Sequence, residues 1–565
     1  MFFTILNFMW IFFSTFLLGF AIMNAFGKCT GKSILSLDYI LISGLMAATV
    51  YAEIFSLVYK VRTLAMAVLL LGNLAIILWG HRKIYDYIKC LIRSRNFWPK
   101  TIVVFCLALI GVMVACQEPN FYDTGLYHAQ AIHWIENYGC VKGLGNLHNR
   151  FAYNSSFLCL QALYSWSAIL GQSLHGMNAY IAVIMAGYSI LSFRFFKRKE
   201  ETIADAFNLF LLLYIGNSIA DISSPNTDFF AMTLMLYIFS RWFRSNFMQE
   251  KCFLCILAVF GVTVKLSIAS LVVIAILPVI DLIRKKQWKI IGVCLLFGGI
   301  VVLPFLIRNV IISGYLIYPY SGIDLFDVDW KMPSYTVTFD RHEIMSWGKG
   351  IKNAYRYDLG IEEWFPLWYE KLAMQHKCLL ILNVGLIVLL FSFIIIMAIR
   401  KKMKEWMFVY LVALLGVGMW FFSAPLLRYG IAYFYLSPAF IIGLLFKQLR
   451  PNKLLRYACC GVLSFPILTN IFLSTGQYME GCETVSIVLP KDYVDFPFYE
   501  YEFEKEISVY IPSEGDRSGY EPFPSIPYQQ RLEIIELRGE GLKEGFRMKD
   551  EYRTEKVTTY GNVNE

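Results

Sequence analysis

The chain has 565 residues, of which 57% are hydrophobic and 16% are charged. Soluble domains carry roughly 25% charged residues, so this composition excludes an ordinary soluble protein and predicts that much of the surface faces lipid. The net charge of +9 does not indicate nucleic acid as a partner. Many Lys and Arg residues stand in short loops between apolar runs, where such residues set the topology of a membrane protein.

Apolar runs of spanning length recur along the chain. Each can cross a hydrocarbon core of about 30 Å, and each must be helical there because no water satisfies the backbone. The first run has no basic segment before it and no small-residue cleavage site, so we expect a membrane helix rather than a signal peptide. We expect fourteen transmembrane helices, at residues 2–25, 37–57, 63–80, 100–117, 176–194, 204–220, 228–243, 252–264, 266–281, 288–311, 378–398, 405–423, 431–447 and 455–473.

Basic residues favour one set of connections between these helices. They gather at residues 81–100, 194–199, 241–251, 284–289, 400–404 and 447–456. The positive-inside rule places these loops in the cytoplasm. The first large loop (residues 118–175), the second large loop (residues 312–377) and the tail from residue 474 are then expected on the outer side.

Residues 252–281 are apolar except for Lys265, and both flanks are basic. Both ends should therefore be cytoplasmic, which predicts a short hairpin with Lys265 at its tip. The alternative is one tilted helix about 45 Å long, at about 1.5 Å per residue. Residues 156–170 are also apolar, but a crossing there would break the parity of the topology, so we expect them to lie along the outer interface.

The tail holds short β-like runs at residues 485–489, 507–511 and 532–537, separated by Gly and Pro, which indicates a small module. The expected fold is an all-α polytopic membrane protein with interfacial outer loops and a small extracytoplasmic α+β segment at the C-terminus. Its parts are N-terminal transmembrane helices (1–117), the first large loop (118–175), a transmembrane core (176–311), the second large loop (312–377), C-terminal transmembrane helices (378–473) and the tail module (474–565).

The first large loop contains the strongest candidate for chemistry. Asp123 follows the end of a membrane helix and begins an amphipathic helix of about fifteen residues. At helical spacing, Asp123, Tyr127, Gln130 and Trp134 share one face. Aromatic rings stack on sugars, and amides and carboxylates bind hydroxyl groups. We therefore interpret this face as a carbohydrate-binding surface with Asp123 as general base. A plain helix cap is the simpler reading of Asp123.

Glu118 is the second candidate for the base, although it also suits an interfacial helix end. His128 and His133 are five residues apart, whereas two metal ligands on one helix are best placed four apart. We therefore expect no metal at this loop. His128 remains a candidate for binding substrate by itself.

Lys265, Arg308 and Arg428 stand at the expected outer ends of helices, where the positive-inside rule would not place them. Ionisable residues at membrane depth are costly and usually have a function or a partner. Three cations at one rim suit a phosphate or diphosphate group; snorkelling or ion pairing is the alternative for each. The further candidate ligands are Arg150, Asn154, Asn309 and Asp228, of which Asp228 also suits a helix cap.

Several strings in the expected outer loops, helix ends and tail are distinctive. They are YDTGLYHAQAIHW (122–134), GLGNLHNRFAYNSS (143–156), SPNTDFF (224–230), VKLS (264–267), RNVIISGYLIYP (308–319) and PLLRYG (425–430), with FPSIPYQ and ELRGEGLKEGFR in the tail. These strings resemble a group of bacterial polytopic membrane proteins related to glycosyltransferases of the GT-C fold. GT-C enzymes are polytopic, use sugar donors linked to a lipid phosphate, and place an Asp or Glu base in the first outer loop.

Asp123 matches the position of the GT-C base, with Glu118 next. The resemblance implies an inverting displacement at the anomeric carbon on the outer face of a bacterial plasma membrane, with a polyprenyl-phosphate sugar as donor and a glycan, lipid or protein as acceptor. Asp123 would take the acceptor proton, while Lys265, Arg308 and Arg428 would stabilise the departing phosphate. Two features depart from the family pattern: three helices precede the usual first one, and no adjacent acidic pair is present. The second departure puts a metal requirement in doubt.

Three other functions stay open. A polysaccharide polymerase or ligase would depend on arginines in its large outer loops rather than on Asp123. A transporter or flippase would need charged residues deep within several helices, whereas most charges here stand at helix ends. A catalytically inactive scaffold would tolerate the loss of Asp123.

Overall fold

The computed structural model describes residues 1–94, 96–449, 452–480 and 486–553, and most of them are helical. All fourteen segments expected to span the membrane fall in helical structure. The elements are α1 (Phe2–Thr30), α2 (Leu37–Val58), α3 (Thr63–Ile92), α4 (Phe97–Ala115), α9 (Met177–Ser192), α10 (Thr202–Asn217), α11 (Thr227–Trp242), α12 (Met248–Val264), η5 (Leu266–Ala275) with α13 (Ile276–Arg284), α14 (Trp288–Ser313), α17 (Met374–Ile399), α18 (Glu405–Ser423), η7 (Ile431–Tyr435) with α20 (Leu436–Leu449), and α21 (Lys453–Glu480).

Nine helical segments in the described part of the chain are long and apolar enough to cross a membrane. The chain is therefore a polytopic helical membrane protein, but the expected number of fourteen spans is not confirmed. Helices α9 to α12 have only 16 or 17 residues each, and a crossing takes about 20. Helix α3 also runs twelve residues beyond the expected end at 80 and includes much of a basic segment that we expected to be a loop.

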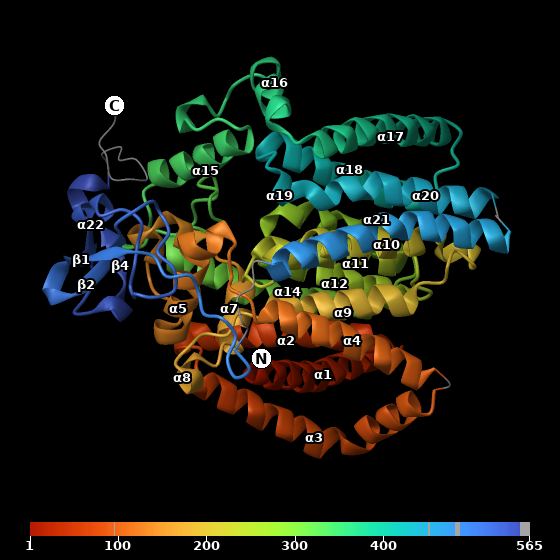
Figure 1. The fold of residues 1–565 in the computed structure, drawn as a ribbon, viewed down its shortest axis with the longest axis horizontal. Helices are drawn as coiled ribbons and strands as arrows, with labels where there is room; N and C mark the ends of the chain where they lie inside the picture. Colours follow the sequence, from red (N-terminus) through yellow and green to blue (C-terminus); the bar gives the residue numbers. More distant parts are fainter. Residues whose placement is uncertain (95, 450–451, 481–485, 554–565) are drawn as a thin grey trace.

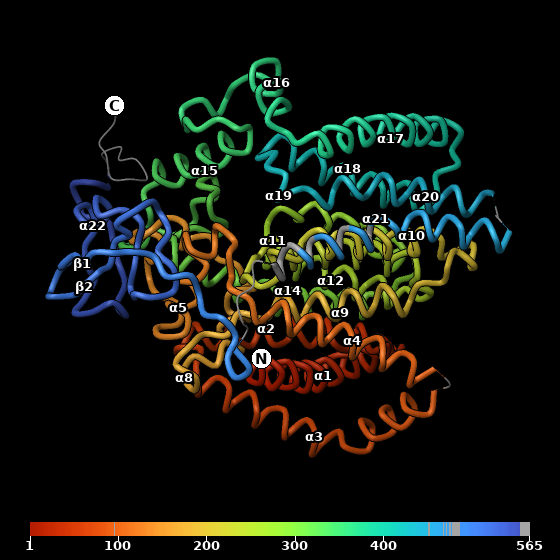
Figure 2. Tube along the Cα trace, in the orientation of Figure 1, coloured from red at the N-terminus to blue at the C-terminus, as the bar shows by residue number. Residues whose placement is uncertain are grey.

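The two sets of loops lie at opposite ends of the helices, as the basic residues predicted (Figure 1). The connections from α17 to α18 and from α9 to α10 are at one end. At the other end lie the tail and two helices from the large loops, α5 (Ala129–Tyr138) and α15 (Ser334–Gly348). Figure 2 shows α21 beside α10, although more than 200 residues separate them in sequence.

The chain breaks at Lys265, as the hairpin interpretation predicted. Lys265 is extended, with φ −158° and ψ 130°, and it ends α12. The following η5 and α13 both contact α12. Helix α7 (Ser156–Leu163) differs from the expectation, because every one of its residues is buried. It packs against α2, α5 and α12 inside the protein and does not lie along an exposed interface.

The tail forms two small antiparallel pairs, β1 (Phe498–Glu502) with β2 (Ser508–Pro512) and β3 (Ile535–Leu537) with β4 (Phe546–Met548). A short helix, α22 (Gln530–Ile534), leads into β3. The expected run at 507–511 overlaps β2, and the expected run at 532–537 contains β3. The first expected run is wrong where it is described, because residues 487–489 form bends and Ser486 belongs to no strand; Val485 lies outside the described residues.

The tail packs on the first large loop, which holds that loop in place. Gln130 donates hydrogen bonds from Nε2 to the carbonyls of Tyr520 and Pro522, at 2.9 Å each, and its Oε1 accepts one from the amide of Ser525 at 3.0 Å. The hydroxyl of Tyr520 also donates to the buried carboxylate of Glu136. The first large loop is thus held in place by contacts with tail residues nearly 400 positions away in the sequence.

Candidate functional site

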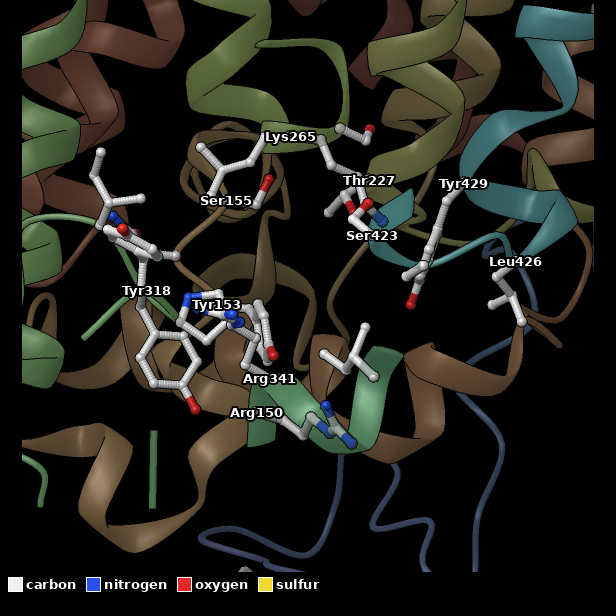
Figure 3. A pocket seen from close by; sticks show the side chains of 18 of the residues that line it. Arg150, Tyr153, Ser155, Thr227, Lys265, Tyr318, Arg341, Ser423, Leu426 and Tyr429 are labelled. Carbon is white, nitrogen blue, oxygen red and sulfur yellow. The ribbon is translucent and has the colours of Figure 1, made fainter. Parts of the chain in front are cut away.

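A cavity of about 610 Å³ lies where the two large loops meet α12, α14 and α18. Much of its lining is apolar and includes Val262, Phe305, Met419 and Phe422 from those helices. Figure 3 shows Lys265, Thr227 and Tyr429 on one side of the cavity, with Arg150, Tyr153, Tyr318 and Arg341 on the other. Its charged lining residues are Asp123, Arg150, Lys265, Arg341 and Arg428.

Asp123 and Arg428 form a two-pronged ion pair at this cavity. Arg428 Nη1 donates to Asp123 Oδ1 at 3.0 Å, and Nη2 lies 2.9 Å from Oδ2. The planar guanidinium matches a carboxylate in this geometry. Arg428 is the second residue of the short helix α19 (Leu427–Gly430). The Asp123 side chain is 9% exposed and that of Arg428 is 33% exposed, so the cation remains accessible.

The pair fixes the charge of Asp123. Burial by itself raises the pKa of this carboxyl, but the positive charges of Arg428 and Lys265 outweigh burial and lower the pKa below its ordinary value. Asp123 is therefore ionised at neutral pH, which is the state that a general base requires. Asp123 makes no side-chain cap to the turn that follows it, so the plain-cap interpretation is wrong.

A second ion pair lies beside the first. Lys265 Nζ contacts the carboxylate of Asp228 and lies 4.5 Å from the ring centre of Tyr429. The hydroxyl of Tyr429 accepts a hydrogen bond from Arg428 at 3.1 Å. The two cations therefore share one aromatic neighbour. The cap of α11 is Asn226, whose side chain accepts from the amide of Asp228, so the cap role expected for Asp228 is wrong.

The opposite side of the cavity is built around Arg150. Its guanidinium lies 3.2 Å from Asp340 and 2.9 Å from Glu343, and all three side chains are buried. Both acids come from α15, in the second large loop. Asp340 also accepts hydrogen bonds from Tyr318 at 2.9 Å and from Tyr153. Arg150 lines the cavity as expected, but its charge is already neutralised by these two carboxylates.

Asn154 and Asn309 also line the cavity, and the amide of Asn154 donates to Asn309 at 3.0 Å. Arg308 does not line it. Its Nε donates to Asn154 at 3.1 Å and its Nη1 donates to Ser56 inside the helix bundle. The prediction of three cations at one rim is therefore wrong for Arg308, which braces the cavity wall from behind.

The family model described as "Domain of unknown function (DUF8201)" matches residues 1–435. The chain belongs to the DUF8201 family. No curated protein and no solved structure matches the chain. Every residue that lines the cavity falls within the matched segment, whereas the tail module lies beyond it.

The expected carbohydrate face is split in the structure. Tyr127 lines the cavity with Asp123, but Gln130 binds the tail backbone, and Trp134 is fully buried against Phe523 and Phe546. The reason is a π-helical turn, η1 (Thr124–His128), that precedes α5. Such a turn inserts an extra residue and rotates the rest of the helix away from the face that regular spacing predicts.

Glu118 and His128 also lie outside the cavity lining. Glu118 accepts a hydrogen bond from Ser223 through its backbone carbonyl. His128 is buried, and neither ring nitrogen has a hydrogen-bond partner among the described residues. Burial lowers its pKa to about 3, so the ring is neutral beside Asp123. In the described residues, no group of three or more His, Cys, Asp or Glu side chains could hold a metal ion.

Sequence reasoning missed the contribution of α15. This helix provides Arg341 to the cavity lining, which also includes Tyr153 and Tyr318 from the two large loops. It also provides Asp340 and Glu343, which hold Arg150 in place. A signal was present in the string FDRHEIMSWG, where the two acids recur three residues apart and so share a helix face. Nothing in the local sequence indicates that this face meets Arg150.

Proposed function

We propose that the protein is an inverting glycosyltransferase of the GT-C type that uses a polyprenyl-phosphate-linked sugar as donor. The observation that carries this proposal is a single cavity with both an apolar part and a charged part. Its apolar lining comes from α12, α14 and α18, which suits an isoprenoid chain, and its polar end holds the ionised carboxylate of Asp123 among cations. A sugar joined through a phosphate to an isoprenoid chain requires both an apolar surface for the chain and charged groups for the phosphate and sugar.

The reaction begins with an acceptor hydroxyl whose proton passes to Asp123 as its oxygen attacks the anomeric carbon of the donor. The bond between that carbon and the phosphate oxygen breaks, and the phosphate leaves with the bonding electrons. The anomeric configuration inverts because the attack is in line. Fixed cations act on the charge that develops on the phosphate oxygen, where preorganised groups in a shielded site contribute most.

The ion pair with Arg428 also controls the strength of the base. In the resting protein the low pKa of Asp123 makes it a weak proton acceptor. A phosphate that shares the exposed guanidinium of Arg428 draws positive charge away from Asp123 and makes the carboxylate more basic. Donor binding thus prepares the base for the proton of the acceptor.

The membrane and the acceptor are part of the proposal. We place the cavity and the tail on the outer face of a bacterial plasma membrane, with a glycan, lipid or protein as acceptor in surface polysaccharide or glycoconjugate synthesis. The distribution of basic loops supports this orientation. A polymerase or ligase is the second candidate, because Arg150, Arg341 and Arg428 all line the cavity.

The test compares Asp123→Asn with Asp221→Asn in the native host. Asp221 is a nearby acid that does not line the cavity, so it controls for general loss of charge. At equal membrane abundance, Asp123→Asn should remove one surface glycan species by mass and cause its lipid-linked donor to accumulate. Normal glycans in Asp123→Asn with loss in Arg428→Gln would favour the polymerase instead.

A further inference from the structure

Arg341 is the exception among the four cations that line the cavity. Arg150 is paired with Asp340 and Glu343, Lys265 with Asp228, and Arg428 with Asp123. Within the described residues Arg341 has no carboxylate at ion-pair distance. Its guanidinium carbon lies 5.8 Å from the ring centre of Tyr320.

The geometry of α15 keeps Arg341 unpaired. Asp340 and Glu343 are buried on the face of α15 that meets Arg150. Arg341 is about 100° around the helix from Asp340. It is an exposed residue and it lines the cavity. The nearest acids in the sequence are therefore already engaged with another cation and point elsewhere.

We infer that Arg341 is the anchor for the phosphate of the lipid ligand. This inference rests on the proposed function, and it assigns the phosphate to a residue outside the predicted group of Lys265, Arg308 and Arg428. A phosphate at Lys265 or Arg428 can only share a cation that a carboxylate already holds, whereas Arg341 offers its whole donor fork as the primary anchor.

The surroundings of Arg341 fit a phosphate held at the edge of an apolar cavity. The phenols of Tyr153 and Tyr318, on the same side of the cavity as Arg341 (Figure 3), donate to Asp340. These hydroxyls are engaged in holding the wall. Ile344 and Met345, from the same helix as Arg341, line the cavity beside it and provide contacts for the first isoprene units.

The test is equilibrium binding of farnesyl phosphate, farnesol and inorganic phosphate to the detergent-solubilised protein, measured by native mass spectrometry. The wild type should bind farnesyl phosphate about tenfold or more tightly than farnesol, since hydrogen bonds to a charged group have about that effect. Arg341→Gln should lose this preference and bind farnesol normally. Arg356→Gln, an exposed arginine of the same loop outside the cavity lining, should behave as the wild type.

Other results overturn the inference. One is an unchanged preference for farnesyl phosphate over farnesol in Arg341→Gln. Another is a loss of this preference only in Lys265→Gln or Arg428→Gln. The third is a wild type that binds farnesyl phosphate and farnesol equally well. Displacement of farnesyl phosphate by an equal concentration of inorganic phosphate would indicate a site for the free anion rather than a lipid headgroup. If Arg341→Gln loses the preference while Asp123→Asn leaves glycans intact, Arg341 is confirmed as the phosphate anchor and the proposed glycosyl transfer is contradicted.

Discussion

Both terminal nitrogens of Arg428 lie at ion-pair distance from the carboxylate of Asp123, at 3.0 Å and 2.9 Å, although 305 positions separate the two residues in sequence. The pair joins the first large loop to the end of the transmembrane region. It also fixes the charge state of the proposed base, so its removal should be visible in the pH dependence of activity.

Arg428→Gln should move the acidic limb of activity to higher pH. Burial raises the pKa of Asp123, and the neighbouring cations now outweigh burial. Without Arg428 the pKa rises, and less Asp123 is ionised at acidic pH. The measurement is the pH profile of glycan transfer in membranes. Arg428→Lys, which keeps the charge, should shift the limb less, and an identical profile in Arg428→Gln would show that Asp123 is not the titrating group.

The same pair should stabilise the fold in a pH-dependent manner. The folded-state pKa of Asp123 is depressed, so its contribution is present above the unfolded value of about 3.9 and is lost as pH falls through the folded value. Thermal melting of the detergent-solubilised protein should therefore show a smaller acid-induced decrease in Tm for Asp123→Asn than for the wild type. A parallel decrease in both would contradict this linkage.

Gln130→Ala should loosen the tail without changing the cavity. The substitution removes the side-chain hydrogen bonds to Tyr520, Pro522 and Ser525. It leaves the buried amide of Ser525 without this partner, at a cost of about 1–3 kcal/mol. Limited proteolysis should cut the tail faster, and binding of farnesyl phosphate should stay within about twofold of the wild type. Weakened ligand binding with a protected tail would restore Gln130 as a substrate ligand.

Arg150→Met should reduce the amount of folded protein. It leaves the buried carboxylates of Asp340 and Glu343 without their cation, and breaking a buried pair costs about 3–5 kcal/mol. Size-exclusion chromatography of a fluorescent fusion measures this loss. Adding Asp340→Asn and Glu343→Gln should recover part of it; a stable single variant would mean that the three charges do not depend on one another.

Hydropathy and charge were enough to predict the helices and the opposite placement of two sets of loops. They also placed Asp123 at the start of a fifteen-residue helix, since η1 and α5 together span residues 124–138. The prediction of the helix face failed because one π-helical turn shifts the register between Tyr127 and Gln130. No periodicity in a sequence of mixed polar and apolar residues specifies such a turn.

The cations show a second limit of sequence reasoning. Lys265, Arg308 and Arg428 look equivalent in sequence, but Arg308 turns into the bundle because Ser56 and Asn154 accept its hydrogen bonds. Arg341 lies in a polar loop where an arginine is unremarkable. Its importance depends on which acids are already engaged by other residues, and those pairings join positions up to 305 residues apart.

The most direct measurement is the release of polyprenyl phosphate by the purified protein. Lipid-linked sugars extracted from cells that lack the protein provide the donor, and membranes from the same cells provide the acceptor. The account predicts release by the wild type and by Asp221→Asn, and a rate at least about 100-fold lower for Asp123→Asn, the usual effect of losing a general base. Equal release by Asp123→Asn and the wild type would contradict it.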